Sequence, residues 1–272
     1  MALKDIRPRG CEVKNYLSVY KKFFETSLAE ASSFRTSFFL IMVMDLVFYF
    51  VTLSSVSIIY DHVATIGSWN KHQLLFFISF MLTMDHLHMV VVSENFWEFS
   101  LKVRTGSLDF DLLRPLPSIF SVFFRYVRTS SLFISPLVWG MLGYFGHKAG
   151  LTLLDWVILP PLIILGFILF VLIEFCLSTA MFWIIEGHGI NFLRMQFQQL
   201  ARWPNFIYNG APRRILTVII PILLVGSGPV HFIYDRQKYQ LLIGLVVAIV
   251  IVGIVLKFLW RFGLNKYDSP SS

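Results

Sequence analysis

Charge and cysteine are both scarce in this chain. Of its 272 residues only 14% are charged, against about a quarter in an average soluble domain. The two cysteines, Cys11 and Cys176, lie in a basic N-terminal segment and inside an apolar run, so we expect no disulfide framework. Hydrophobic residues make up 56% and Phe alone occurs 28 times. Several apolar runs reach membrane-spanning length, so the sequence indicates an integral membrane protein rather than an oily soluble domain.

Several catalytic signatures are also missing. The sequence has no G-x-x-x-x-G-K-[ST] phosphate loop, so ATP hydrolysis by that route is excluded. A Ser-His-Asp order, paired cytosolic acids and a dinucleotide fingerprint are absent too. His86 and His88 are two residues apart and point to different sides of a helix, so we expect no metal site. We therefore expect no catalytic residue and no cofactor in this chain.

Six runs are apolar and long enough to be candidate spans, since a spanning helix needs about 20 residues. More than thirty polar or amphipathic residues precede the first run and no small-residue cleavage site follows it, so no removable signal peptide is expected. The fifth run is interrupted by Pro221 and by Gly226-Ser227-Gly228-Pro229, which favours a short helix, a break and a second short segment near the outer face. The runs are 37–60, 72–93, 119–145, 153–184, 214–233 and 239–260.

Orientation follows from the basic residues. Nineteen of the 23 Lys and Arg fall before the first run, in the second-to-third and fourth-to-fifth connections, and at the C-terminal end. Because positive residues concentrate on the cytoplasmic side, both termini are expected in the cytoplasm. Arg194, Arg202, Arg213 and Arg214 are counted there. The net charge of +7 then reflects topology and contact with anionic membrane lipid, not nucleic acid.

The segment before the first span has helical periodicity. An amphipathic helix lying in the inner membrane interface is predicted, with a soluble helix packed on a partner as the alternative. This divides the chain into a cytoplasmic N-terminus with the interfacial helix (1–36), a transmembrane domain (37–260) and a cytoplasmic tail (261–272). The apolar stripe comprises Val13, Tyr16, Leu17, Tyr20, Phe24 and Leu28.

A polar bend interrupts the oily sequence between the second and third runs, over residues 94–118. Apolar residues recur at helical spacing until Gly106, which favours a left-handed helix cap. Asp109 falls in the first turn of a second short helix, and Pro115 stops it. The pattern predicts two short, capped helices at a bend, facing the cytosol and exposing apolar and charged groups to a soluble partner.

This bend resembles a signature of one family. Gly106 to Pro115, GSLDFDLLRP, is similar to the Gly-x-Leu-Asp-x-x-Leu-Leu-(Arg/Lys)-Pro motif of six-span permeases of type-2 ATP-binding-cassette (ABC) exporters. Two further stretches resemble that branch: Ala201 to Ile222 is similar to its Arg-Tyr-Pro segment, with Trp203 in place of Tyr, and Gly263 to Ser272 to its Gly-Leu-x-x-Tyr ending.

The resemblance implies an all-α, six-span exporter permease of a bacterial cytoplasmic (inner) membrane. It implies a separate ATPase subunit that carries ATP and Mg, a second permease (itself or a related chain), and alternating access. The cargo stays open among drug, lipid, glycan and peptide. The bend would be the region that couples to the ATPase, through Phe96, Phe99, Val103, Arg104, Gly106, Leu108, Asp109, Leu112, Leu113, Arg114 and Pro115.

Acidic residues at membrane depth form the last set of candidates. Asp85 and Glu174 either line a substrate path or subunit seam, or pair locally with a His, Ser or Thr, and for Asp45 we favour pairing or snorkelling. An intramembrane enzyme using Asp85 or Glu174 is the alternative function, followed by a channel or structural subunit. The break at Gly226, Gly228 and Pro229 is predicted to form an outer gate, with a plain proline kink as the alternative.

Overall fold

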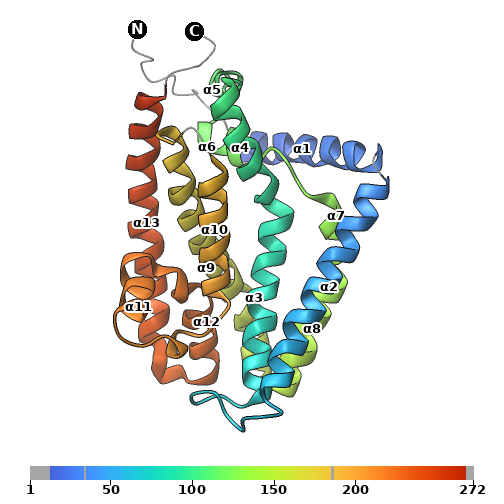
Figure 1. Ribbon diagram of the computed structural model, residues 1–272, viewed down its shortest axis with the longest axis vertical. Coiled ribbons are helices and arrows are strands. Elements are labelled where there is room, and N and C mark those ends of the chain that lie inside the picture. The colour runs from blue at the N-terminus through green and yellow to red at the C-terminus, as the bar shows by residue number, and fades with distance from the viewer. Residues whose placement is uncertain (1–12, 34, 185–186, 268–272) are drawn as a thin grey trace.

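The computed structural model describes residues 13–33, 35–184 and 187–267, and throughout these ranges the regular structure is helical (Figure 1). The predicted all-α class is confirmed for this part of the chain. The first twelve residues, with Cys11 and three of the counted basic residues, and the end of the Gly-Leu-x-x-Tyr segment (268–272) lie outside the described residues.

Four long apolar helices form the frame of the bundle. They are α2 (Arg35–Ile59), α3 (Lys71–Val91), α9 (Leu153–Ser178), which continues as a 3₁₀ turn over Thr179–Phe182, and α13 (Tyr239–Lys266). Each is long and apolar enough to cross a membrane. Helix α3 is central, since 83% of its most apolar window is buried against 22% for the α2 span and for the α13 span. These helices match the first, second, fourth and sixth predicted spans.

The third predicted span is wrong as a continuous helix. Residues 119–145 are divided among α6 (Ser118–Phe123), α7 (Thr129–Leu132) and α8 (Ser135–Lys148). The chain is not helical between α6 and α7, where Arg125 and Arg128 turn inward to the carboxylates of Asp111 and Asp45. Helix α8 has 14 residues, about 21 Å at 1.5 Å per residue, and packs along α3.

The fourth-to-fifth connection is also different from the prediction. Helix α10 (Gly187–Ala201) runs beside α9 within the bundle (Figure 1), with Arg194 only 2% exposed. Its first residue packs against Ser100 of α4 (Ser93–Thr105), at the end of the bundle that holds the polar bend. Arg194 therefore lies in a buried helix, and the prediction of an exposed loop at this position is wrong.

The chain beyond α10 forms a bent hairpin. Helix α11 (Gly210–Arg214) continues as a π-helix over Ile215–Ile219. A 3₁₀ turn (Pro221–Leu223) then leads into α12 (Leu224–Tyr234), and the two arms meet at 78°. The break thus falls at Ile220 and Pro221, since Pro221 has no N–H to continue the first helix.

The predicted break at Gly226-Ser227-Gly228-Pro229 is wrong, because these residues are buried within the continuous helix α12. The glycines serve close packing instead. A side chain at Gly226 would collide with Met81 and Phe77 of α3, and a Cβ at Gly228 would lie 3.2 Å from the carbonyl oxygen of Leu241. Tertiary packing therefore overrides the local helix-breaking tendency of the sequence.

Both ends of the hairpin lie at one end of the bundle. Before it, the Phe206 ring packs on Trp69 in the α2–α3 loop, with centroids 4.9 Å apart. After it, the Tyr234 hydroxyl donates to the Gln73 carbonyl at 3.1 Å, and Arg236 pairs with Asp155 at the start of α9. The segment from 205 to 236 therefore enters and leaves at the same end, as a re-entrant hairpin does.

Helix α1 (Val13–Ser33) lies across the bundle, at a steep angle to α2 (Figure 1). Its Tyr16 ring meets Phe120 edge-on at 5.4 Å, which fixes one side of the helix to α6. Leu17 and Leu28 are exposed at 69% and 41%. The predicted helix is confirmed, and its apolar exposed residues suit an interfacial location.

Candidate coupling region

The polar bend consists of α4, Gly106 and the short helix α5 (Leu108–Leu112). Gly106 has φ +77° and ends α4 in the left-handed conformation, as predicted. A residue with a Cβ would be strained there, so glycine permits the sharp turn. In Figure 1 the bend lies at the end of the bundle where α13 finishes. The α4–α5 corner thus consists of two short helices joined by a tight turn, and Gly106 caps the first of them.

The predicted contact residues of the corner range from fully buried to strongly exposed. Phe96, Phe99 and Leu108 are fully buried, so the expectation that they belong to an exposed docking face is wrong for all three. Leu113, at 75%, remains strongly exposed. Val103, Asp109, Leu112 and Arg114 are partly exposed, while Arg104 and Pro115 are exposed. Phe110, at 72%, lies beside Leu113 in sequence and was not among the predicted contacts.

The buried phenylalanines connect the corner to the long helices. Phe99 packs on Phe123 of α6 with ring centroids 5.2 Å apart, and Phe123 stacks on Phe175 of α9 at 4.3 Å. Phe99 also lies 5.8 Å from Trp260 of α13. These rings form a continuous packed connection from α4 through α6 to α9, and directly from α4 to α13.

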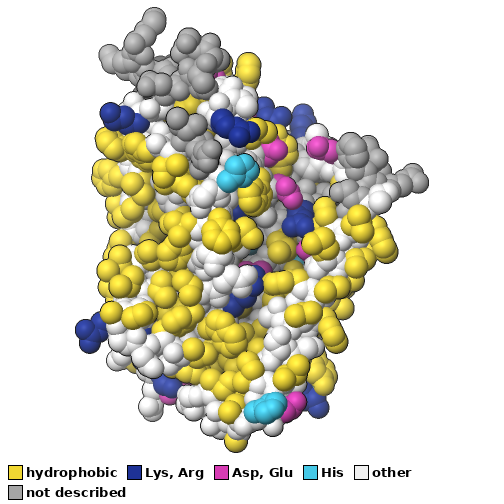
Figure 2. Space-filling model, viewed as in Figure 1, with side chains coloured by type: hydrophobic (Ala, Val, Ile, Leu, Met, Phe, Trp, Pro, Cys, Tyr) yellow, Lys and Arg dark blue, Asp and Glu magenta, His cyan; other side chains and the backbone are white. Residues whose placement is uncertain are grey.

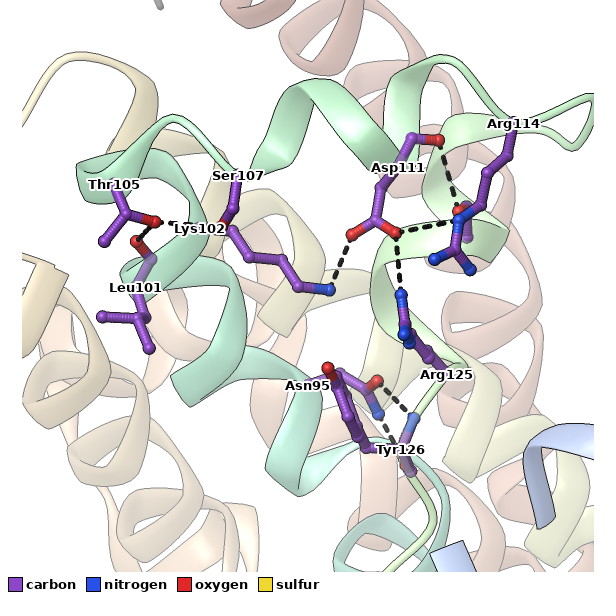
Figure 3. Close-up of polar contacts among 10 residues, drawn as sticks. Asn95, Leu101, Lys102, Thr105, Ser107, Asp111, Arg114, Arg125 and Tyr126 are labelled. Carbon is purple, nitrogen blue, oxygen red and sulfur yellow. Dashed lines mark hydrogen bonds and ion pairs between the residues drawn. The ribbon is translucent and has the colours of Figure 1, made fainter. Parts of the chain in front are cut away.

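A buried ion cluster braces the same corner (Figure 3). The Asp111 carboxylate, 1% exposed, receives Lys102 Nζ at 2.6 Å, Arg125 Nη1 at 3.3 Å and Arg114 Nε at 3.4 Å. Ser121 donates to the Asp111 carbonyl at 3.3 Å. These contacts bind α4, α5 and α6 into one unit, and charge-assisted hydrogen bonds are the stronger kind.

Sequence reasoning missed Asp111 as a functional candidate and chose Asp109, which is only partly buried. A signal was present, because four cationic residues lie within 14 positions of Asp111, and three of them contact it. Helix spacing alone could not show that they converge, since Lys102 and Arg125 reach Asp111 only through the turns at Gly106 and after Pro115.

Asp111→Ala is expected to destabilise the permease by about 3 kcal/mol, because it leaves the Lys102 ammonium buried without its carboxylate. Asp109→Ala on the same helix is the matched control and should change stability by less than about 1 kcal/mol. Thermal unfolding of the two purified variants in one detergent measures the difference. Equal melting temperatures for the two variants would contradict the bracing role.

The intramembrane acid Glu174 is paired locally. Its carboxylate contacts the His88 ring of α3 and the Gln198 amide of α10, and lies 3.1 Å from Arg194 Nη1. Arg194 in turn covers the Phe96 ring with its guanidinium carbon 4.1 Å from the centroid. Glu174 is 1% exposed. The cluster therefore fastens α3, α9 and α10 and reaches the base of α4.

The other two acids are paired as well. Arg202 Nε lies 2.8 Å from the Asp85 carboxylate, which is buried in α3. Asp45 receives the Ser131 hydroxyl at 2.9 Å and lies 3.5 Å from Arg128. Local pairing, one of the two alternatives for Asp85 and Glu174, is thus what the structure has: Glu174 contacts His88, a histidine partner as predicted, together with Arg194, and Asp85 pairs with Arg202.

Comparison with known proteins agrees with this geometry. A family model described as ABC-2 family transporter protein matches residues 46–271. The chain belongs to the ABC-2 transporter family. The match spans the α4–α5 corner and two of the three paired acids, Asp85 and Glu174. A search of curated proteins gave no match, and a search of solved structures gave none either. This ABC-2 protein is therefore a multi-pass membrane permease subunit of an ABC transporter, whose ATP-binding subunit is a separate partner.

Proposed function

We propose that this ABC-2 permease is an exporter subunit that docks its ATP-binding subunit on the α4–α5 corner. The observation that supports this is the combination of two exposed apolar side chains, Phe110 and Leu113, with a base held rigid by Asp111. ATP and Mg are bound by the partner, and closure of the ATPases moves the corner. The aromatic contacts to α9 and α13 carry the motion into the spans, which gives alternating access.

The proposed membrane topology has six passes, formed by α2, α3, α8, α9, α10 and α13. Helix α10 takes the place of the predicted fifth run, because it leads from the α4 end towards the α2–α3 loop. The excess of basic residues stays at the corner end, through Arg104 and Lys266 among others. Both termini are then cytoplasmic, and the membrane is a bacterial cytoplasmic membrane.

Cysteine labelling tests this topology at Asn209, an exposed residue just before the hairpin. In a background with Cys11→Ser and Cys176→Ala, Asn209→Cys should react with an impermeant maleimide added to intact cells. Ser68→Cys and Lys148→Cys should react likewise. Arg104→Cys and Lys266→Cys should react only after permeabilisation. Asn209→Cys that reacts only after permeabilisation would restore the fifth span predicted from the sequence, and external labelling of Arg104→Cys would overturn the docking proposal.

A second permease, itself or a related chain, completes the proposed transporter. Helices α2 and α13 expose most of their apolar windows, and membrane lipid or that second permease covers them. The outer end of the bundle is closed by packing of the hairpin against α3 and α13, to which Gly226, Gly228 and Pro229 contribute. These residues do not form a helix break that could open as a gate. Asp85 and Glu174 fasten helices at the seam between α10 and its neighbours.

Export is favoured over an intramembrane enzyme because Asp85 and Glu174 are already occupied by arginine partners. The deciding experiment is reconstitution: release of co-purified small molecules from vesicles should require the ATP-binding subunit and ATP. Mass spectrometry of molecules bound in native membrane then distinguishes drug, lipid, glycan and peptide cargo. Turnover or conduction by the permease alone would favour the enzyme or the channel.

A further inference from the structure

A separate hollow lies where α1 meets α2 and α4, on the side of the bundle away from α13. It has a volume of about 340 Å³, within the size range of small-molecule sites. Figure 2 shows acidic side chains gathered around this hollowed part of the surface, beside Lys and Arg side chains. Its walls come from α1, α2, α4 and the extended segment that ends at α7.

The charge of the hollow is predominantly negative. Glu30 of α1 and Glu94 and Glu98 of α4 all line it, against one basic residue, Arg128. Arg128 already has Asp45 at 3.5 Å and Glu94 at 3.8 Å as partners. Within the described ranges no ion pair involves Glu30 or Glu98. The residues that line the hollow therefore carry more negative than positive charge, and an opposite charge nearby stabilises ionised carboxylates.

A buried hydroxyl provides an independent sign of a missing partner. Thr129 lines the hollow and is 2% exposed, yet its Oγ1 has no hydrogen-bond partner. Buried polar atoms without partners are rare, since each costs about 1–3 kcal/mol. A hydroxyl oxygen can accept a hydrogen bond from the N–H of a primary ammonium group. A quaternary ammonium group has no N–H and cannot donate such a bond.

The remaining wall is apolar. Phe38 and Ile41 of α2 and Ala31 of α1 face the hollow, beside Val127. The extended segment is held in place on both sides, because Val127 N–H donates to the Ser27 hydroxyl at 3.2 Å and Arg128 N–H to the Val90 carbonyl at 3.1 Å. An apolar wall beside carboxylates suits a molecule with a charged head and an alkyl tail.

We infer that this hollow binds an amphiphile with a primary ammonium head. The carboxylates of Glu30, Glu94 and Glu98 surround the ammonium group, Thr129 Oγ1 accepts one of its N–H groups, and the tail lies on Phe38 and Ile41. Two sources have this chemistry: the headgroup of phosphatidylethanolamine in the bilayer, and a free long-chain amine. The inference concerns binding alone and does not depend on export or on ATPase docking.

Radiolabelled dodecylammonium bound to the full-length permease in nanodiscs tests the inference. In phosphatidylglycerol nanodiscs we expect one saturable site per chain above the signal of empty discs. Glu30→Gln with Glu98→Gln should weaken binding at least tenfold, and Thr129→Val several-fold. Glu25→Gln is the matched control: it lies on the same helix, exposed and paired with Lys21 at 3.9 Å, and should bind as wild type does. Dodecyltrimethylammonium should bind more weakly than dodecylammonium.

Phosphatidylethanolamine in the discs separates the two sources. A tenfold or greater loss of dodecylammonium binding on adding this lipid identifies the headgroup as the natural occupant, whereas undiminished binding identifies a free amine. Variants are compared only where their melting temperature and gel-filtration profile match those of the wild type. If the double variant fails this criterion, Thr129→Val provides the test, because valine keeps the shape of the threonine side chain. Binding equal in wild type and in the folded variants, or no binding above empty discs, would overturn the inference.

Discussion

Replacing both Phe110 and Leu113 with Asp is expected to detach the ATP-binding subunit from the permease. Both side chains are more than 70% exposed at the α4–α5 corner, so the substitutions leave the permease fold intact. Burying such a side chain contributes about 1.5–3 kcal/mol. Loss of two such contacts should weaken association at least about 100-fold, since each 1.4 kcal/mol is a factor of ten. ATP-driven transport should then fall to background.

The measurement is the amount of ATP-binding subunit that co-purifies with each variant from native membranes, followed by ATP hydrolysis in proteoliposomes. Leu153→Asp is the matched control, since Leu153 is 82% exposed and begins α9 at the opposite end of the bundle. It should retain the partner in full. Wild-type recovery of the partner by the double variant would place the docking surface elsewhere on the permease.

Arg194→Leu is expected to be the most destabilising single substitution in the bundle, at about 3–5 kcal/mol, because it leaves the Glu174 carboxylate buried without its permanently charged partner. The double variant Arg194→Leu with Glu174→Leu should recover much of that loss, because a buried ion pair can be replaced by apolar side chains at little net cost. Thermal unfolding of the purified permease in detergent gives both values.

Arg213→Leu is the control for this pair of variants. Arg213 is an exposed arginine on α11, and its substitution should change stability by less than about 1 kcal/mol. A single Arg194→Leu variant that melts with the control would show that the cluster contributes little. A double variant no more stable than the single one would show that packing around residue 194, rather than charge, dominates.

The sequence predicts four spans correctly because each is a long uninterrupted apolar run, and hydrocarbon forces such runs to be helical. It does not reveal α10, whose sequence GHGINFLRMQFQQLA carries a charge and several amides. Arg194 is tolerated inside the bundle only because Glu174 and His88 are there to meet it. Because those partners lie on other helices, the sequence of α10 alone predicts a polar connection rather than a buried helix.

The α4–α5 corner is predictable in outline but not in detail. Gly106 fixes the turn through its own backbone freedom, a property of one residue, and its prediction is confirmed. Which side chains the turn exposes depends on what α6, α9 and α13 present to it. Phe99 is buried because Phe123 and Trp260 cover it, whereas nothing covers Phe110 to a similar extent. The same dependence on distant partners hid Asp111.

The pairing of α3 with α10 has a consequence for synthesis of the protein. Asp85 and Arg202 are 117 residues apart, and His88 and Arg194 are 106 apart. At a translation rate of about 5–20 residues per second, the ribosome makes Arg202 roughly 6 to 23 s after Asp85. For that interval Asp85 and His88 of α3 have no partner from α10, and a lone ionised group in hydrocarbon is costly. We therefore expect helix α3 to stay beside the translocon, in contact with its water, until α10 emerges.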